Sequence, residues 1–461
     1  MPSNENLARA HGVATDALAF VRQHALQNPD IERAASRLLN FTPRVLVSGL
    51  CSVGKSSFVS ALWGDSELLP TAVRDCTQTN TLIRVPKAGE TDRTLRLNFL
   101  PRDKALAYAL RGLAFHRIAG LIEETLGPTG FGPRLDELPP HERLTESVRL
   151  TRALFKERPS LFVLHEQVTD DLEEIEQFLA FLDSPDCKPG GTADARWEDR
   201  REHLMGRRRP DGRTLEVGKL LSLEHVEVIR ATPRWTINGG KSPWLPEVLD
   251  TPWIPAYHEA RRTELIHEQA RGADILIVLA LPQAFTFEEW VLKTLRERPE
   301  LVKRTIVLFN QIDTVDTAAL FTRDGFATVF QNNLNTLTKL GIAPENVLLS
   351  CARLPFLTHS PDAQTAAVQE RIQRLKEILA RLGKLALSRA ESEFTRKLKP
   401  ACDPADCGIE TLRARLDELA AGAVLSARVR ELAGALASIP ALDLSSGARE
   451  EVRQLLERIH R

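Results

Sequence analysis

The chain has 461 residues, of which 43% are hydrophobic and 27% are charged, and its formal net charge is -1. These values are ordinary for globular proteins, so they exclude a wholly disordered chain, and the length leaves room for two or three domains. The near-zero charge gives no overall attraction to nucleic acid, so no specific nucleic-acid binding is expected. Six scattered cysteines, no signal pattern and no long apolar run predict a soluble, cytoplasmic protein, with peripheral membrane contact left open.

Apolar residues recur at helical spacing over residues 5–40 and are interrupted by NPD at 28–30, which predicts two helices. From Arg44 onward, short apolar runs alternate with helical segments, a pattern typical of a mostly parallel sheet covered on both faces. The predicted strands are 44–48, 81–85, 94–99, 226–231, 247–250, 275–280, 305–309 and 346–350. The predicted helices between them include 57–63, 258–271, 286–299 and 317–340.

Two further blocks are helical by pattern. Residues 102–185 carry an apolar stripe and are punctuated by GPTGFGP and DCKPGG, which predicts a helical insertion within the α/β domain. Helical stripes also continue after residue 358, broken around CDPADCG. The sequence therefore predicts N-terminal helices at 1–41, an α/β domain at 42–357 and a C-terminal helical segment at 358–461, the first and last packing together as a bundle.

The stretch GLCSVGKS fits the pattern G-x-x-x-x-G-K-[ST] and lies between a predicted strand and a predicted helix. Glycines let backbone N–H groups converge on phosphates, and the helix N-terminus adds partial positive charge. Lys55 would reach the β- and γ-phosphates, and the Ser56 hydroxyl would bind Mg²⁺. The strand–turn–helix context disfavours a chance glycine turn. The predicted phosphate site comprises Gly49, Cys51, Ser52, Val53, Gly54, Lys55, Ser56 and Ser57.

The stretch NQID at 310–313 follows the predicted strand TIVLF. A carboxylate at Asp313 can accept both the ring N–H and the exocyclic amine of guanine, a pair that adenine does not offer. Asn310 would help to hold the base, and Ser350 and Cys351 end the last strand where a base-contacting loop is expected. The alternative is a surface turn with a helix cap, in which case the chain would be a P-loop ATPase.

Two stretches between these motifs are candidates for the metal shell. VLDTPW is an apolar strand that ends in Asp250, which is placed to hold Mg²⁺ through water. The segment 68–85 has several threonines before a strand, and one of them could bring its hydroxyl to Mg²⁺ and its N–H to the γ-phosphate.

Together, GLCSVGKSSFVSALWGDSELLP, LDTPW, ADILIVLA and NQID resemble the GTPase domain of the dynamin superfamily, especially its bacterial members, over residues 42–355. The resemblance implies a P-loop GTPase domain that hydrolyses GTP with Mg²⁺ and dimerises, as a homodimer or with another dynamin-like subunit. It places Thr77 on the Mg²⁺-binding switch threonine and Ser52 on a phosphate-loop serine near the leaving phosphate. Ser52, Lys55 and Thr77 would then be catalytic, and Ser56, Thr77 and, through water, Asp250 would hold the metal.

The sequence departs from the family pattern at three places. Trp253 replaces the glycine of D-x-P-G, although its backbone N–H could still meet the γ-phosphate. Gln311 replaces the lysine of N-K-x-D, whose stem packs on the base, and Cys51 replaces a polar residue. The first change favours an alternative function, a GTP-dependent interaction module with slow or no hydrolysis. Arg74 is the nearest candidate for an arginine finger and is equally well explained as a solvated loop residue.

The one basic cluster lies at 196–213. It fits a contact with lipid phosphates or nucleic acid, but the Asp and Glu residues within it fit a solvated loop or helix face better. The C-terminal segment is too short for a full-length dynamin stalk, so remodelling of a membrane or of a partner stays open.

Overall fold

The structure is a computed structural model of the chain. It describes residues 2–24, 26, 28–50, 53–69, 80–126, 135, 137–199, 203–204, 207–208, 214–215, 222–231, 236–237, 240–241, 246–251, 260–283, 287, 289–389, 391–440 and 445–460.

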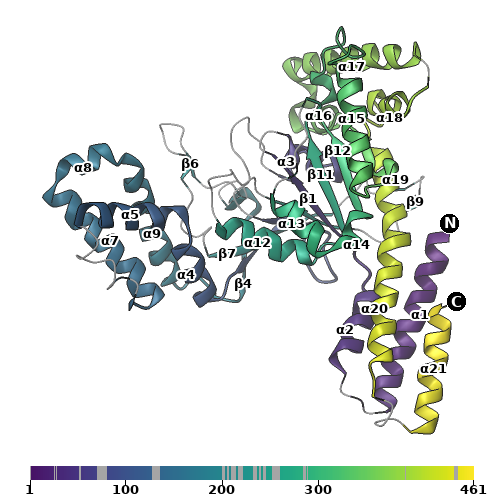
Figure 1. The fold of residues 1–461 in the computed structure, drawn as a ribbon, viewed down its shortest axis with the longest axis horizontal. Coiled ribbons are helices and arrows are strands. Elements are labelled where there is room, and N and C mark those ends of the chain that lie inside the picture. Colours follow the sequence, from purple (N-terminus) through teal and green to yellow (C-terminus); the bar gives the residue numbers. More distant parts are fainter. Residues whose placement is uncertain are drawn as a thin grey trace.

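A nine-stranded sheet lies at the centre of the described structure, in the order β13-β12-β11-β1-β10-β2-β7-β3-β4 (Figure 1). The ladders from β13 to β10 are all parallel, as is β2–β7, and the other three are antiparallel. The predicted mostly parallel sheet is therefore confirmed. Its strands are β1 (Arg44–Gly49), β2 (Thr81–Arg84), β3 (Thr94–Phe99), β4 (Thr192–Ala195), β7 (Leu223–Ile229), β10 (Glu247–Asp250), β11 (Ile275–Ala280), β12 (Thr305–Phe309) and β13 (Val347–Leu349).

Each predicted strand is present, although β7 starts earlier than expected, at Leu223. The edge strand β4 was not predicted, because its sequence TADA has no apolar run and its side chains are partly exposed. Two short hairpins were missed as well: β5 (Arg207–Arg208) with β6 (Thr214–Leu215), and β8 (Thr236–Ile237) with β9 (Gly240–Lys241).

Alternate residues of the central strands face two different layers. In β1, Val45 and Val47 belong to the same buried cluster as Phe58 of α3 (Lys55–Trp63). Leu46 instead packs in the cluster of the helices on the opposite face. Those helices are α12 (Ala260–Arg271), α13 (Glu289–Glu297) and α14 (Pro299–Val302). Because both faces are covered, β11 and β12 are buried along their whole length, which explains their continuous apolar sequences.

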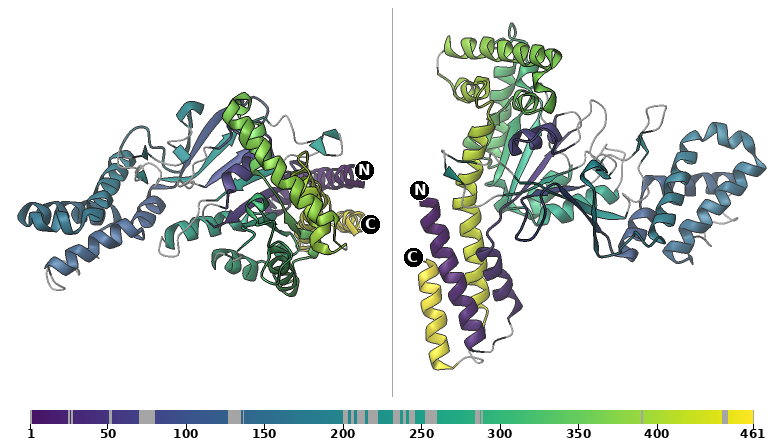
Figure 2. Two further views of the ribbon diagram at one scale, coloured as in Figure 1. Left: turned by 90° about the horizontal axis from the view of Figure 1, so that it is seen from above. Right: turned by 180° about the vertical axis from the view of Figure 1, so that it is seen from behind.

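The helical insertion lies between β3 and β4 and extends away from the sheet (Figures 1 and 2). Its described helices are α4 (Arg102–Leu110), α5 (Leu113–Leu126), α7 (Pro140–Glu157), α8 (Pro159–Leu164) and α9 (Glu166–Leu182). Ile118, Leu172 and Phe178 are fully buried between these helices, and the Arg117–Asp171 ion pair joins α5 to α9. The predicted insertion is confirmed.

Among the described helices, none is by itself both long enough and apolar enough to cross a bilayer. Within the described part of the chain, one pair, α4 and α5 taken together, passes that test of length and composition, and the two helices are bent by 52° where they meet.

After β13, the next helices cover the end of the sheet formed by β12 and β13. α16 (Arg353–Thr358), α17 (Ala366–Leu387) and α18 (Glu393–Cys402) pack with α15 (Phe326–Lys339) against β12 and β13. Phe330 and Phe394 contact each other in this layer, with ring centroids 5.4 Å apart and ring planes tilted by 54°. The short 3-10 turns are η1 (Trp197–Asp199), η2 (Ile312–Thr314), η3 (Pro344–Asn346) and η4 (Pro361–Gln364).

The helix predicted at 317–340 begins only at Phe326. Before it, the Thr322 N–H donates to the Ala319 carbonyl and the Gly325 N–H donates to the Thr322 carbonyl, so the chain turns twice. Gly325 then caps the helix with an extended backbone. The apolar residues of 317–325 therefore lie on these turns and do not form one face of a helix.

The last helices join the N-terminal ones. α19 (Ile409–Leu419), the π-helical turn η5 (Ala420–Val424) and α20 (Leu425–Ala437) follow one another as a long helical stretch (Figure 2). α20 and α21 (Ser446–His460) pack with α1 (Pro2–Gln23) and α2 (Pro29–Leu39) in a bundle beside the α/β domain (Figure 1). The predicted bundle is confirmed, although α17 and α18 lie on the α/β domain. The domain boundaries at 41/42 and 357/358 stay a prediction.

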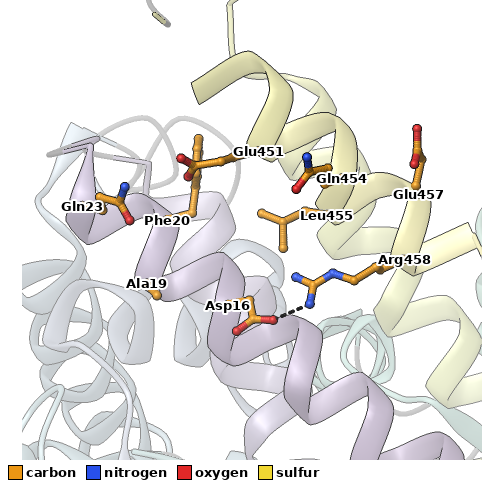
Figure 3. Close-up of a pocket in the computed structure, with 9 residues that line it drawn as sticks. All are labelled: Asp16, Ala19, Phe20, Gln23, Glu451, Gln454, Leu455, Glu457 and Arg458. Carbon is orange, nitrogen blue, oxygen red and sulfur yellow. Dashed lines mark ion pairs between the residues drawn. The ribbon is translucent and has the colours of Figure 1, made fainter. Parts of the chain in front are cut away.

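A groove of about 500 Å³ runs between α1 and α21 on this bundle (Figure 3). Its walls are mostly polar, and the Arg458 guanidinium reaches across it to Asp16 at 2.7 Å. The groove is therefore a feature of the bundle surface, separate from the predicted nucleotide site.

Candidate functional site

The predicted site residues lie where the parallel strands β1, β10, β12 and β13 end. Lys55 and Ser56 follow β1, Asp250 ends β10, Asn310 follows β12 and Ser350 follows β13. The carboxyl ends of parallel strands share one edge of a sheet, and ligands of open α/β folds bind outside that edge. The fold therefore brings together four stretches that are far apart in sequence.

Two glycines shape the loop between β1 and α3. Gly49 has a φ of 150°, and a Cβ there would lie 2.6 Å from the carbonyl oxygen of Leu279 in β11. Gly54 has a φ of 84° and directly precedes the first residue of α3. The loop can thus pass against β11 and then turn into the helix only with glycine at these positions. α3 begins directly after Gly54, and the N-terminus of a helix suits anions.

The Lys55 side chain folds back over this loop. Its Nζ donates to the carbonyl oxygen of Gly49 at 2.6 Å and to that of Leu50 at 3.1 Å. The residue is only 9% exposed, so its charge is held next to the loop by backbone acceptors. An ammonium group in this position is available to an anion that enters the loop.

Ser56 and Asp250 meet beside the loop. The Ser56 Oγ donates to the Asp250 Oδ2 at 2.9 Å, and Asp250 is fully buried. The next residue, Thr251, donates its hydroxyl to the Val47 carbonyl at 2.8 Å, which ties the end of β10 to β1. Hydroxyl and carboxylate oxygens are the ligands that Mg²⁺ prefers, so this pair fits the predicted metal shell. Across the whole described part of the chain, this pair included, His, Cys, Asp and Glu form no group of three able to hold a metal ion.

Asn310 connects the two halves of the site. Its Nδ2 donates to the Val53 carbonyl at 3.0 Å, and its Oδ1 accepts from the Ala352 N–H at 3.1 Å. The side chain is buried, so both bonds are shielded from water. The phosphate loop and the loop after β13 are therefore fixed to the same amide group.

Asp313 lies in the short turn η2 and is buried. Its Oδ1 accepts from the Cys351 thiol at 3.3 Å, and its Oδ2 pairs with the Arg353 Nη1 at 3.2 Å. Gln311, two residues earlier, has a φ of 62°, and its Nε2 lies 3.4 Å from where a Cβ on Gly54 would be. The stretch that leads into η2 and Asp313 thus lies beside Gly54.

The loop after β13 is held by a distant turn. The Ser350 Oγ donates to the Cys407 carbonyl at 2.9 Å, and the Cys351 N–H donates to the same carbonyl at 3.0 Å. Burial raises the pKa of the Cys351 thiol well above its usual value, and the nearby charge of Asp313 raises it further. Cys351 therefore stays protonated and donates to the carboxylate. Arg353 and Cys407 belong to none of the predicted motifs: Arg353 lies two residues after the predicted Cys351, whereas no local signal marks Cys407.

Several predicted site residues fall outside the residues that the structure describes. They are Cys51, Ser52, Thr77 and Trp253, together with the arginine-finger candidate Arg74. Their predicted roles stay predictions. So do the roles assigned to the described residues, whose positions are compatible with them.

No protein-family model matches the chain, and no curated protein sequence matches it. Among solved structures, two of an oligomerised bacterial dynamin pair are similar; they are described as providing a mechanism for the long-range sensing and tethering of membranes. One has a TM-score of 0.39 over 98% of this chain and the other 0.40 over 99%, each at 12% sequence identity.

The similarity is one of fold. No residue role, ligand or partner is taken from it. The chain spans 58% of the length of each of these bacterial dynamin chains.

Proposed function

We propose that this chain binds GTP with Mg²⁺ and hydrolyses it. One observation carries the proposal. Along a single sheet edge, Lys55, Ser56 and Asp250 lie at one end, and the buried carboxylate of Asp313 lies at the other. Asn310 is hydrogen-bonded both to the loop before α3 and to the loop after β13. A nucleotide has the same polarity, with charged phosphates at one end and a hydrogen-bonding base at the other.

The phosphate end of this arrangement supplies charge and donors. Phosphate oxygens would replace the Gly49 and Leu50 carbonyls as acceptors for the Lys55 ammonium. Charge-assisted hydrogen bonds of this kind are about twice as strong as neutral ones, so the exchange is favourable. The loop amides and the N-terminus of α3 add further donors.

The Ser56–Asp250 pair would hold Mg²⁺ beside the phosphates, with Thr77 as the predicted third residue. When bound, the ion would neutralise charge that develops on the transferred phosphoryl group. In the described site, Ser56 and Asp250 are already positioned by their mutual hydrogen bond, and Thr251 anchors this segment to β1.

At the other end, Asp313 favours guanine over adenine. A buried carboxylate that loses its donors costs free energy, and guanine offers two N–H groups on one edge where adenine offers none to match. The Cys351 thiol and the Asn310 bonds keep this carboxylate and its loop in place.

A competition experiment tests the proposal. Fluorescently labelled GDP is bound to the purified chain with Mg²⁺ and displaced with GTP or ATP, and phosphate release from GTP is followed in parallel. We expect GTP to displace the label at far lower concentration than ATP, and phosphate to be released from GTP. Equal displacement by ATP would support the alternative of a P-loop ATPase.

A second candidate, a slowly hydrolysing GTP-dependent interaction module, is favoured by a different observation. The loop after β13 is bonded to Cys407, and Arg413 of α19 donates from Nε to the Leu62 carbonyl at the end of α3 at 3.2 Å. The loop after β13 thus contacts the turn before α19, and α19 contacts the end of α3 that lies opposite Lys55 and Ser56. Three results together would favour this candidate over rapid hydrolysis: tight GTP binding, slow phosphate release by the wild type, and fast phosphate release by Trp253→Gly.

The proposal includes two further predictions from the motifs. The first is pairing of two GTPase domains, with a second copy or with another dynamin-like subunit, and the second is peripheral contact with a membrane. Their support is the motif resemblance alone, and their tests are separate from those of nucleotide binding.

A further inference from the structure

The carboxylate of Asp313 has two donors of different kinds. The Cys351 thiol, which bonds to Oδ1 at 3.3 Å, is buried and belongs to a loop fixed by Cys407. The Arg353 guanidinium, which bonds to Oδ2 at 3.2 Å, is on a side chain that is 53% exposed, whereas the Asp313 side chain is 2% exposed. One donor is therefore fixed, and the other is free to turn into solvent.

A buried carboxylate without a compensating charge is costly, so the ion pair with Arg353 stabilises the site when no base is present. Guanine would bring two N–H donors to the same carboxylate. The thiol is a weak donor, and each carboxylate oxygen can accept more than one hydrogen bond, so Cys351 can remain where it is. The bulky guanidinium lies against Oδ2 itself and would have to leave.

Resting on the proposed function, we propose that Arg353 is a displaceable counter-ion that competes with the guanine base for Asp313. It sets how fast nucleotide is captured without contacting nucleotide once it is bound. Arg353 must be released in the empty site before the base can dock, so the pair lowers the association rate constant and leaves the dissociation rate constant unchanged.

The expected size of the change in association rate follows from the exposure of the Arg353 side chain. A two- to fivefold change corresponds to about 0.4–1 kcal/mol at about 1.4 kcal/mol per factor of ten, which lies within the range of about 0.2–1 kcal/mol for an ion pair with an exposed partner. Salt screens such a pair, so the effect should shrink as ionic strength rises.

Stopped-flow binding of fluorescent GDP to the full chain with Mg²⁺ tests this. The variants are Arg353→Gln, Arg353→Ala and, as a control, Arg374→Ala, which removes an exposed arginine of α17 and makes the same charge change. We expect both Arg353 variants to associate about two- to fivefold faster at low salt, with unchanged dissociation, because a weak ion pair is lost. At about 0.5 M salt the difference should fall, since the screening length is then shorter than 8 Å. The control should behave as the wild type.

Three results would overturn the inference. Equal association rates for wild type and Arg353→Gln would show that the pair does not hinder the base. Faster dissociation in the Arg353 variants would show that this side chain contacts bound nucleotide. If the wild type binds no labelled GDP at all, the proposed function fails and the inference with it, a result distinct from the other two.

Discussion

The Asn310 amide holds two loops that would touch opposite ends of a nucleotide. Its Nδ2 bonds to the Val53 carbonyl in the phosphate loop, and its Oδ1 accepts the Ala352 N–H after β13. Because both bonds are buried, displacement of one loop strains the other. Phosphate binding and base binding should therefore be coupled through this side chain.

Asp313→Asn gives the sharpest test at the level of one residue. The variant keeps the size of the side chain but replaces one acceptor oxygen by an NH₂ donor, which faces the guanine amine unfavourably. Two charge-assisted hydrogen bonds are worth about 1.5–3 kcal/mol each, so GDP affinity should fall about 10²–10⁴-fold. Xanthosine diphosphate, which has an oxygen in place of that amine, should bind the variant better than GDP does. Titrations with fluorescent nucleotides measure both affinities.

The matched control is Asp324→Asn, an exposed aspartate between η2 and α15. It makes the same chemical change on the same side of the domain and should leave both affinities as in the wild type. Unchanged GDP affinity in Asp313→Asn would refute the role of this carboxylate in reading the base.

Site residues that belong to short motifs could be predicted from the sequence, and those that act across the fold could not. Lys55 and Ser56 follow a glycine loop, and Asp313 follows a buried strand, so local pattern places them. The Cys407 carbonyl reaches Ser350 from 57 residues away, and a backbone acceptor has no sequence signature. Arg353 is near the predicted loop, but its partner becomes evident only once η2 and α16 are placed together.

At the level of elements, α20 is fastened to the sheet by a buried ion pair. The Arg428 Nη2 lies 2.6 Å from the Asp274 Oδ2, which also accepts the backbone N–H of Arg44 at the start of β1. Both charged side chains are nearly buried. The bundle is thus attached to the strand that leads into the phosphate loop.

Arg428→Met should destabilise the folded chain, because it leaves Asp274 buried without its partner. Breaking a buried pair from one side costs about 3–5 kcal/mol, and the remaining bond from Arg44 places this case near the lower value. Chemical denaturation measures the free energy of unfolding. Arg430→Met, which changes an exposed arginine on the same helix, is the control and should have little effect. If Arg428→Met lowers the free energy of unfolding no more than Arg430→Met does, the ion pair contributes nothing to stability.

A second group of charges joins β2, β7 and the turn after β2. Arg84 pairs with Glu227 at 2.7 Å and with Glu90. Burial alone would raise the pKa of Glu227, but hydrogen bonds from His225 and Arg84 and their charges lower it to about 2. A carboxylate whose pKa is lower in the folded state stabilises the fold above its unfolded pKa and loses that contribution as the pH falls through the folded value.

Glu227→Gln should therefore destabilise the chain at neutral pH and matter less in acid. The difference in unfolding free energy between wild type and variant should be full above about pH 4.5 and shrink toward pH 2, as Glu227 takes up its proton. Urea unfolding at a series of pH values measures it. For Glu370→Gln, an exposed control on α17, a small difference that does not vary with pH is expected. A pH-independent difference for Glu227→Gln would contradict the assignment.

Helices and strands with a strong periodic pattern could be predicted from the sequence, whereas the position of each one in the fold was harder to predict. Continuous apolar runs identified the buried strands, whereas the edge strand β4 has only the sequence TADA. The stripes of α17 and of α20 look alike in sequence, yet α17 packs on the sheet and α20 in the bundle. Which apolar face meets which partner depends on the turn at Asp403–Gly408, whose geometry no local pattern specifies.

At the scale of the whole molecule, the helical insertion and the bundle extend from different sides of the α/β domain (Figures 1 and 2). The site lies on the domain between them, where β1, β10, β12 and β13 end. α19, η5 and α20 link the site's end of the domain to the bundle through the bonds of Cys407, Arg413 and Arg428. These bonds connect the end of the domain that carries the candidate site to the bundle.

If two GTPase domains pair across their nucleotides, as the sequence resemblance predicts, hydrolysis must depend on concentration. Phosphate release per molecule should rise with protein concentration and level off once most chains are paired. Single-turnover and steady-state assays over a wide concentration range measure this. A constant rate per molecule would contradict pairing while leaving nucleotide binding intact.

The central claim is that one sheet edge holds a guanine nucleotide between Lys55 and Asp313. Isothermal titration calorimetry of the purified chain with Mg²⁺ tests it most directly, with GDP and ADP as ligands and Lys55→Ala as the matched variant. Saturable heat is expected with GDP and little with ADP, and GDP binding should be strongly weakened in the variant. No heat with GDP or GTP, or equal affinities for GDP and ADP, would contradict it.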